Sequence, residues 1–306
     1  MFIESRRKRS APRIESTNAN ALTREIINER FAALVANTLH LPVLREDMLG
    51  EGEGAWDPDP RYPTTTVNCI VWLQLIIAEL YGWDHDQETK LHIMDRIRYY
   101  GGHVAYGLRK SHYLDLWLML EPEPLVRIRL TGLPGYTRGF IKVKKEQFKT
   151  FHDYRGPLYR EELDAFDIDY ITGEGLVNCV RNLAPGYYIS FGVAGPYYLS
   201  LYGQGQGPMG LVHSLVIKVS DSSEAQQDGQ SDGEAVVYHA STVSGSVNEV
   251  PLAEYVGRMS NLFHGYALFE LDPNWDFLAK PTADEEMKRI LDCEATLPRH
   301  NDHRKL

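Results

Sequence analysis

The sequence predicts an α+β fold in which helices pack on one side of an antiparallel sheet. Residues 66–82 have the apolar periodicity of a buried helix, while residues 211–220 and 235–240 have the composition of two strands that pair as a hairpin. Because the chain has 306 residues, 43% of them apolar, it can bury one large core or two small ones.

The helix expected over residues 66–82 carries signals at both ends. Thr66 is a residue type that caps helix N-termini, and Gly82 is a residue type that ends helices. Apolar side chains cover most sides of this helix, which predicts burial in the core. They are Cys69, Val71, Trp72, Leu73, Leu75, Ile76, Ile77 and Leu80.

Cys69 lies in the first turn of this expected helix. The unpaired N–H groups and the positive end of the helix dipole there favour a thiolate, which is the nucleophilic form of cysteine. Taken alone, Cys69 also fits a small side chain of the core, since free cysteine is among the most buried residue types. Residues elsewhere in the chain decide between these two interpretations.

The other elements follow from the same periodicities. An acidic loop rich in glycine and proline, residues 49–63, leads into the helix that carries Cys69. Residues 144–185 are expected to hold loops and one or two short helices, and the Gly- and Tyr-rich residues 186–210 to be irregular. Helices are further expected over residues 22–40, 88–99 and 252–259, and strands over residues 125–130, 140–143 and 265–271.

Charge and composition exclude several classes of protein. The net charge of −10 argues against a partner with a nucleic-acid backbone. Three cysteines cannot make a fully paired disulfide framework, and no spacing typical of a zinc site occurs in the sequence, so neither metal nor cofactor is expected. No apolar run reaches the roughly 18 residues that a membrane span needs.

His213 and His239 lie on the two strands of the predicted hairpin. The two-residue period of a strand places His213 on one face with Leu215. A thiol nucleophile needs a base within hydrogen-bond distance and a third group that orients the base, and two histidines on paired strands can fill these roles. Each histidine precedes a small residue, Ser214 or Ala240, which leaves room for a substrate.

Several segments resemble, in order, the N-acetylmuramoyl-L-alanine amidase-like family of NlpC-like cysteine peptidases, which belong to the papain clan. The resemblance covers roughly residues 60–270. It rests on Cys69 at a helix start, Ile-Arg-Tyr-Tyr-Gly-Gly at 97–102, Arg-Lys-Ser-His-Tyr-Leu-Asp-Leu-Trp at 109–117, Gly-Leu-Val-His-Ser at 210–214, Tyr-His-Ala-Ser at 238–241 and Val-Asn-Glu-Val-Pro-Leu-Ala-Glu-Tyr at 247–255.

The resemblance implies a role for each matching residue. Cys69 is then the nucleophile, His213 the base and His239 the orienting group. Substrate-binding positions are expected to line the cleft, and among them an arginine suits a peptide carboxylate because a guanidinium binds it with two hydrogen bonds. These positions are Arg109, His112 and Tyr113, together with Asn68 and Ser214, where the family usually has Asp before its Cys and Ser-His-Val-Gly around its His.

The resemblance further implies a papain-like domain, with N-terminal helices that bear the cysteine and an antiparallel sheet or half-barrel that bears the histidines. We expect a single catalytic domain at residues 21–275, with a middle insertion at about residues 83–200. A disordered basic tail is expected at residues 1–20, and a charged C-terminal tail at residues 276–306.

The implied activity is hydrolysis of an amide bond in bacterial peptidoglycan or in muropeptides. Two alternatives stay open: a binding or scaffold protein that kept the fold and lost the chemistry, and an acyltransferase of the same superfamily. Asn68 and Ser214 support the loss of chemistry, because both depart from the family pattern.

The expected location follows from the N-terminus, where the basic cluster at residues 6–9 precedes no apolar segment and is therefore not a conventional secretory signal. The protein is expected to be cytoplasmic as made. It would reach the periplasm through a dedicated secretion system, as an antibacterial toxin effector with an inhibitor (immunity) protein, or act on muropeptide fragments in the cytoplasm.

Overall fold

The computed structural model describes residues 22–44, 49–53, 55–63, 65–110, 124–142, 154–160, 165–194, 210–221, 235–280 and 282–297. The helices of this part are α1 (Arg24–Thr38), α2 (Cys69–Tyr81), α3 (Gln87–Arg98), α6 (Gly173–Val180), α9 (Leu252–Met259) and α10 (Glu285–Thr296), with short 3-10 turns η1 (Tyr100–Gly102) and η2 (Tyr106–Leu108). The strands are β1 (Leu125–Arg127), β2 (Tyr136–Lys142), β3 (Ala165–Ile171), β4 (Gly186–Ala194), β5 (Gly210–Val219), β6 (Val236–Ser241), β7 (Ser246–Pro251) and β8 (Phe263–Leu271).

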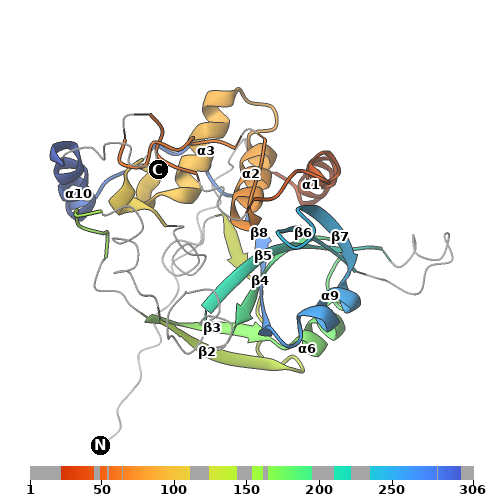
Figure 1. Cartoon of the computed structure of the whole chain (residues 1–306). Helices are drawn as coiled ribbons and strands as arrows, with labels where there is room; N and C mark the ends of the chain where they lie inside the picture. The colour runs from red at the N-terminus through yellow and green to blue at the C-terminus, as the bar shows by residue number, and fades with distance from the viewer. Residues whose placement is uncertain are drawn as a thin grey trace, which may run out of the picture.

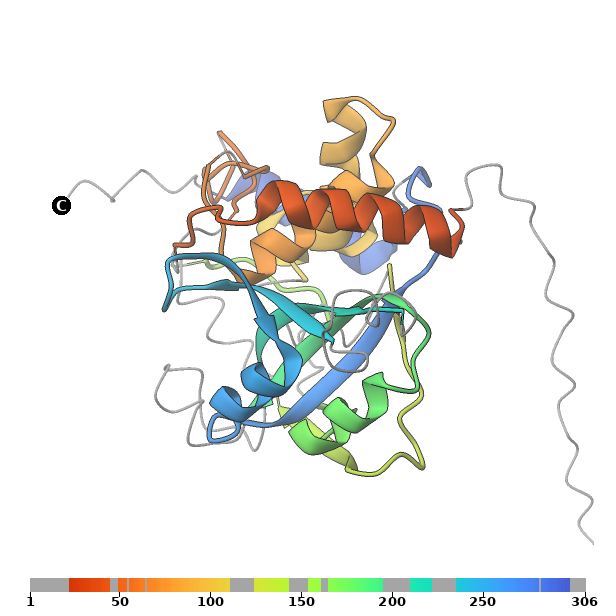
Figure 2. The same cartoon turned by 90° about the vertical axis from the view of Figure 1, so that its right-hand side faces the viewer.

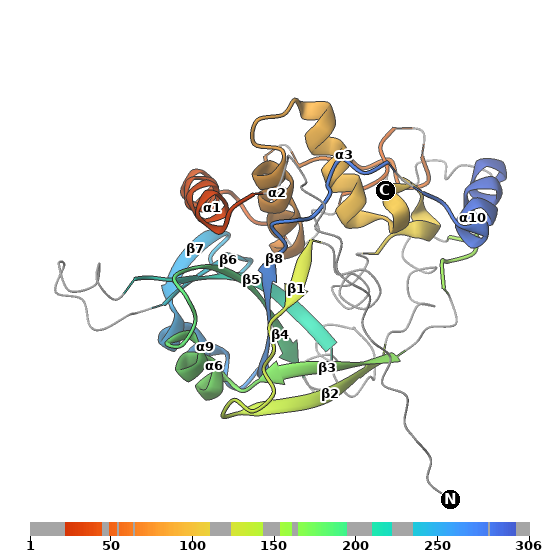
Figure 3. The same ribbon diagram turned by 180° about the vertical axis from the view of Figure 1, so that it is seen from behind.

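All eight strands belong to one antiparallel sheet, which confirms the predicted α+β class. The strand order is β2-β3-β8-β4-β5-β6-β7, and β1 pairs with β8 beside this path. Helices α1, α2 and α3 lie together on one side of the sheet (Figure 1). Helices α6 and α9 lie on its other side (Figure 2), toward which the sheet curls between β7 and β2 (Figure 3).

Strand β4 corrects the expectation that residues 186–210 are irregular. It pairs with β5 on one side and with β8 on the other, and eight of its nine residues are buried. A strand buried on both faces shows no alternation between apolar and polar residues, so periodicity does not reveal it. Since β4 lies inside the predicted insertion at 83–200, part of that range belongs to the centre of the sheet.

Two further strands lie where the sequence predicts none. Strand β3 occupies residues 165–171 and pairs with β2 over its whole length, and β7 occupies residues 246–251 and pairs with β6. The predicted hairpin of β5 and β6 is confirmed, since Val216 pairs with Tyr238. The predicted tail at residues 1–20 and most of the linker between β5 and β6 lie outside the described residues.

Helix α2 begins at Asn68 rather than at the expected Thr66. The Asn68 side chain accepts a hydrogen bond from the Val71 N–H at 2.9 Å, which satisfies one of the free donors of the first turn. The predicted end is confirmed, because the Gly82 N–H donates to the carbonyl of Ala78 at 2.9 Å. These caps make Cys69 the first residue of the helix.

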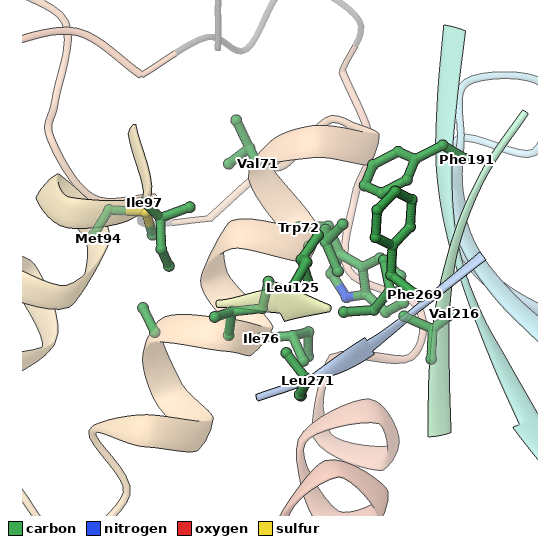
Figure 4. Close-up of a cluster of buried hydrophobic side chains, with 14 of the residues drawn as sticks. Val71, Trp72, Ile76, Met94, Ile97, Leu125, Phe191, Val216, Phe269 and Leu271 are labelled. Carbon is green, nitrogen blue, oxygen red and sulfur yellow. The ribbon is translucent and has the colours of Figure 1, made fainter. Parts of the chain in front are cut away.

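Helix α2 packs between α3 and the sheet (Figure 4). Trp72 is fully buried, and its indole N–H donates to Thr38 Oγ1 of α1 at 3.0 Å. Each large apolar side chain buried in this way contributes about 1.5–3 kcal/mol. The surrounding cluster contains Ile76 from α2, Met94 and Ile97 from α3, and Phe191, Val216 and Phe269 from the sheet. The start of α2 is therefore held rigidly against the strands.

Helix α10 lies within the residues expected to form a charged C-terminal tail. Its Ile290 is fully buried and packs with Leu108 and Tyr159. Its Glu294 accepts hydrogen bonds from the N–H groups of Tyr106 and Gly107 in η2, at 2.8 and 3.1 Å. This helix is thus packed on the body of the protein.

Candidate active site

Cys69 occupies the first position of α2, and its side chain is half-buried. Burial raises the pKa of its thiol, and hydrogen bonds from Ser214 and from the N–H groups of Ile70 and Cys69 itself oppose that rise. The helix terminus therefore acts in the expected direction. Because burial outweighs it, the resting side chain is a neutral thiol rather than the thiolate that the helix position alone suggests.

Strand β5 presents neighbouring residues to different parts of the molecule, since side chains alternate along a strand. Val216 packs into the cluster around α2, whereas Leu215 and Ile217 pack in the second cluster, which contains residues of α6 and α9. Ser214 has the same parity as Val216, and its hydroxyl donates to the carbonyl of Cys69 at 2.6 Å. His213 has the parity of Leu215.

His213 and His239 meet on this second side. Nε2 of His213 lies 3.1 Å from Nδ1 of His239, and the two rings are nearly perpendicular, at 85°. Both residues lie just beyond the paired part of β5 and β6, which ends at Val216 and Tyr238. The contact engages Nε2 of His213, so Nδ1 is the nitrogen of this ring that can accept a proton from a thiol.

Both imidazoles are neutral at physiological pH. Burial lowers the pKa of His213 to about 4. Burial, His213 and Arg258 lower the pKa of His239 to about 3. In a neutral pair one ring donates and the other accepts. If Nδ1 of His213 is the acceptor for a thiol proton, its Nε2–H donates to Nδ1 of His239.

Helix α9 backs the histidine pair. The ring of Tyr255 meets the ring of His239 edge to face, with centroids 5.0 Å apart and planes at 71°. Tyr255 is buried, and it lies within the segment 247–255 that carries the resemblance. The sequence contained this signal, but it did not identify Tyr255 as the neighbour of His239.

Cys69 and the histidine pair take part in two separate contacts, and among the described residues no hydrogen bond joins the Cys69 thiol to His213. The hydrogen bonds of the Cys69 thiol come from Ser214 and from helix N–H groups, and the hydrogen bond of His213 goes to His239. Ser214 and His213 are adjacent in β5, so the strand that contacts the start of α2 also carries the predicted base. Hydrogen bonds between catalytic groups are often long or misaligned before a substrate binds.

Arg109 lies in a different environment from the one predicted. Its side chain is 3% exposed and forms ion pairs with Glu51 and, at 2.9 Å, with Asp57, both from the acidic loop. Glu51 also accepts a hydrogen bond from Tyr99. A guanidinium buried between two carboxylates holds the loop in place, and this burial argues against the predicted contact between Arg109 and a substrate carboxylate.

The other predicted substrate-binding residues have different outcomes. Asn68 caps α2, and Ser214 contacts the start of the same helix. His112 and Tyr113 lie outside the described residues. The sequence patterns did not identify Glu51 and Asp57 as the partners of Arg109, although their acidic loop directly precedes the helix of Cys69. Among the described residues, no group of three or more His, Cys, Asp or Glu side chains could hold a metal ion.

Solved structures share this fold at low sequence identity. Protein LPG0564 of Legionella pneumophila, assigned to the DUF1460 family, has a TM-score of 0.62 at 16% identity, over 84% of this chain and 91% of that chain. An N-acetylmuramoyl-L-alanine amidase of Bacteroides uniformis has a TM-score of 0.56 at 14% identity, over 80% of this chain and 99% of that chain. A proposed xylanase of Bacteroides fragilis has a TM-score of 0.53 at 14% identity, over 78% and 100% of the two chains.

No protein-family model and no curated protein sequence matches this chain. None of the described helices is long and apolar enough to cross a membrane. The structural similarities confirm the expected α+β architecture, in which helices precede an antiparallel sheet. At these identities they establish the fold of the chain and leave its chemistry to the residues of the site.

Proposed function

We propose that this protein is a cysteine amidase in which Cys69 is the nucleophile, His213 the general base and His239 the group that orients the base. The observation that carries the proposal is the 3.1 Å contact between His213 and His239. His213 lies on β5, and the next residue of that strand, Ser214, contacts Cys69. A thiol, a neutral imidazole and a second ring that fixes the first one meet the needs of nucleophilic catalysis.

The proposed reaction begins from neutral groups. Nδ1 of His213 takes the proton of the Cys69 thiol, and the resulting thiolate attacks the carbonyl carbon of an amide. The imidazolium then protonates the leaving amine, and water hydrolyses the thioester. Cys69 is the first residue of α2, and the N–H groups of Cys69 and Ile70, which hydrogen-bond the resting thiol, would stabilise the oxyanion that forms in both steps.

The proposed substrate is an amide bond in bacterial peptidoglycan or in muropeptides. This part of the proposal rests on the fold shared with the N-acetylmuramoyl-L-alanine amidase of Bacteroides uniformis and on the motifs around Cys69, His213 and His239. A secretion route, an antibacterial role and an immunity protein stay predictions from the sequence.

Mass spectrometry of digested muropeptides tests the proposal. The wild-type protein should release products cut at an amide bond, and Cys69→Ala should release none while its circular dichroism spectrum stays unchanged. Cys179→Ala is the matched control, because Cys179 is a buried cysteine of α6, away from the start of α2. If Cys69→Ala keeps full activity and Cys179→Ala loses it, the assignment of the nucleophile is wrong.

A binding or scaffold protein is the second candidate, and the raised pKa of Cys69 favours it, since an inert thiol does no chemistry. Alkylation by iodoacetamide at neutral pH separates the two candidates without a substrate. An active site should give rapid labelling of Cys69 that depends on His213, whereas an inert cysteine should label slowly in both the wild type and His213→Asn.

A further inference from the structure

Ser214 makes the contact that joins the helix of Cys69 to the strand of His213. Its side chain is fully buried, and its hydroxyl donates to the carbonyl of Cys69 at 2.6 Å. Its backbone N–H also donates toward the Cys69 thiol. One residue of β5 thus binds both the backbone and the side chain of Cys69.

This contact fixes the position of β5 relative to the start of α2. A helix carbonyl has two lone pairs, and the hydroxyl of Ser214 can use the one that the intrahelical bond leaves open. Cys69 begins α2, whose far side is held by the buried cluster around Trp72. His213, the neighbour of Ser214 in β5, is held by His239 from the other side. A shift of β5 against α2 would therefore change the separation of thiol and imidazole.

We propose that Ser214 is a positioning residue, rather than a substrate-binding one, and that its hydroxyl sets the start of α2 against β5 so that Cys69 and His213 come within reach of each other. This inference rests on the proposed function, in which these two residues exchange a proton. Small displacements of reacting groups cost about 10²-fold in rate, so the hydroxyl should matter to turnover as well as to stability.

A purely structural hydrogen bond is the competing interpretation, because any buried hydroxyl needs a partner. Ser190 of β4 provides a matched control. It is also fully buried, and its hydroxyl donates to a backbone carbonyl, that of Ala267 in β8, at 3.0 Å. Ser190→Ala and Ser214→Ala each remove one buried hydroxyl that donates to a backbone carbonyl. Only the bond of Ser214 involves α2.

The experiment measures iodoacetamide alkylation of Cys69 against pH in the full-length protein, by mass spectrometry of the Cys69 peptide. Ser214→Ala should move the alkylation profile to higher pH, because loss of the bond from the hydroxyl to the Cys69 carbonyl shifts the thiol away from the backbone N–H of residue 214, whose hydrogen bond opposes the rise of the pKa of Cys69. It should also lower kcat on muropeptides by about 10- to 100-fold, with little change in KM. Ser214→Thr keeps the hydroxyl and should restore part of both quantities.

Ser190→Ala should lower the melting temperature about as much as Ser214→Ala and leave both the alkylation profile and kcat at wild-type values. The proposal is overturned if Ser214→Ala keeps the wild-type profile, or if Ser190→Ala moves it equally. Alkylation needs no substrate. A wild-type protein that alkylates normally but cuts no muropeptide would therefore refute the amidase, while the variants would still decide the role of Ser214.

Discussion

Two polar clusters lie beside the buried core of this protein, and they differ in how their charges are balanced. Around Arg109, a cation pairs with the carboxylates of Glu51 and Asp57. Burial would lower the pKa of Arg109, but Glu51, Tyr99 and Asp57 outweigh it and raise the pKa. At the candidate active site, His213 and His239 pair with each other, and burial is the largest cause that keeps both rings neutral.

This difference in charge balance suits the Arg109 cluster to a structural role and the histidine pair to a catalytic one. A charge that is fully paired stays in one protonation state and holds its neighbours, as Arg109 holds the acidic loop. A thiol and two neutral imidazoles can exchange a proton, although burial opposes the thiolate and imidazolium that result. Substitutions in the first cluster should change stability, and substitutions in the second should change turnover.

The largest effect is expected at His213. His213→Asn and His213→Ala should each lower kcat by about 10²–10⁴-fold, because neither side chain can take the thiol proton and return it to the leaving amine. His239→Asn should cost less than His239→Ala, since an amide can still hydrogen-bond to Nε2 of His213. Turnover of muropeptides by the four variants, with circular dichroism to verify folding, provides the measurement.

An equal response of the two histidine positions would contradict the division into a base and an orienting group. A nearly wild-type His213→Asn would remove His213 from the mechanism altogether. Either result would place the histidine pair with the Arg109 cluster, as a part of the scaffold.

Arg109→Ala should lower the stability of the protein and leave substrate binding unchanged. Removal of the guanidinium takes the countercharge from the buried carboxylates of Glu51 and Asp57, and the loss of one partner of a buried ion pair typically destabilises a protein by about 3–5 kcal/mol. Arg109→Lys should cost less, because an ammonium keeps the charge but loses the two-pronged geometry. Urea unfolding measures the free energy, and KM per folded molecule should stay at the wild-type value. A raised KM would instead support the substrate contact that the sequence predicted for Arg109.

Arg138→Ala is the control for this loss of stability. Arg138 and Asp167 form an ion pair between β2 and β3, with side chains 65% and 53% exposed. Exposed pairs contribute about 0.2–1 kcal/mol, so this variant should unfold at nearly the wild-type urea concentration. If Arg138→Ala and Arg109→Ala cost the same, burial does not distinguish the two ion pairs.

The fold was predictable wherever local pattern and tertiary environment agree. The apolar spacing and the glycine at the end of α2 identify that helix, and the strands with His213 and His239 have a composition typical of strands. In strand β3 apolar and polar residues alternate, since Asp167 and Asp169 separate Phe166, Ile168 and Tyr170, so a signal was available there. Strand β4 gave none, because both of its faces are buried.

The candidate site was predictable in its residue types but not in its contacts. Local sequence shows that Cys69 starts a helix and that two histidines lie on paired strands. The bond from Ser214 to Cys69 joins residues 145 positions apart, and Arg109 finds its carboxylates 58 and 52 positions away. Such partners depend on how the helices pack against the sheet, which no local pattern records.

The histidine pair should also give the stability of the protein a pH dependence. An unfolded histidine has a pKa of about 6.5, whereas burial lowers that of His213 to about 4 and that of His239 to about 3. Between these values the unfolded chain binds more protons than the folded one, so stability should fall as the pH drops from about 6.5 toward 4. Above pH 6.5 both states are neutral at these positions, and the contribution vanishes.

The double variant His213→Asn/His239→Asn should flatten this part of the curve, and the measurement is the urea midpoint at several values between pH 4.5 and pH 7, within the window set by those pKa values. Asp95 and Glu294, whose pKa values burial raises, titrate as a common background in the wild type and the variant, so the difference between the two curves isolates the histidines. Both curves should converge near neutral pH apart from a constant offset. Parallel curves down to the lowest pH would show that the two imidazoles titrate as exposed groups. In that case burial in the neutral form would not be what distinguishes the histidine pair from the ion pairs of Arg109.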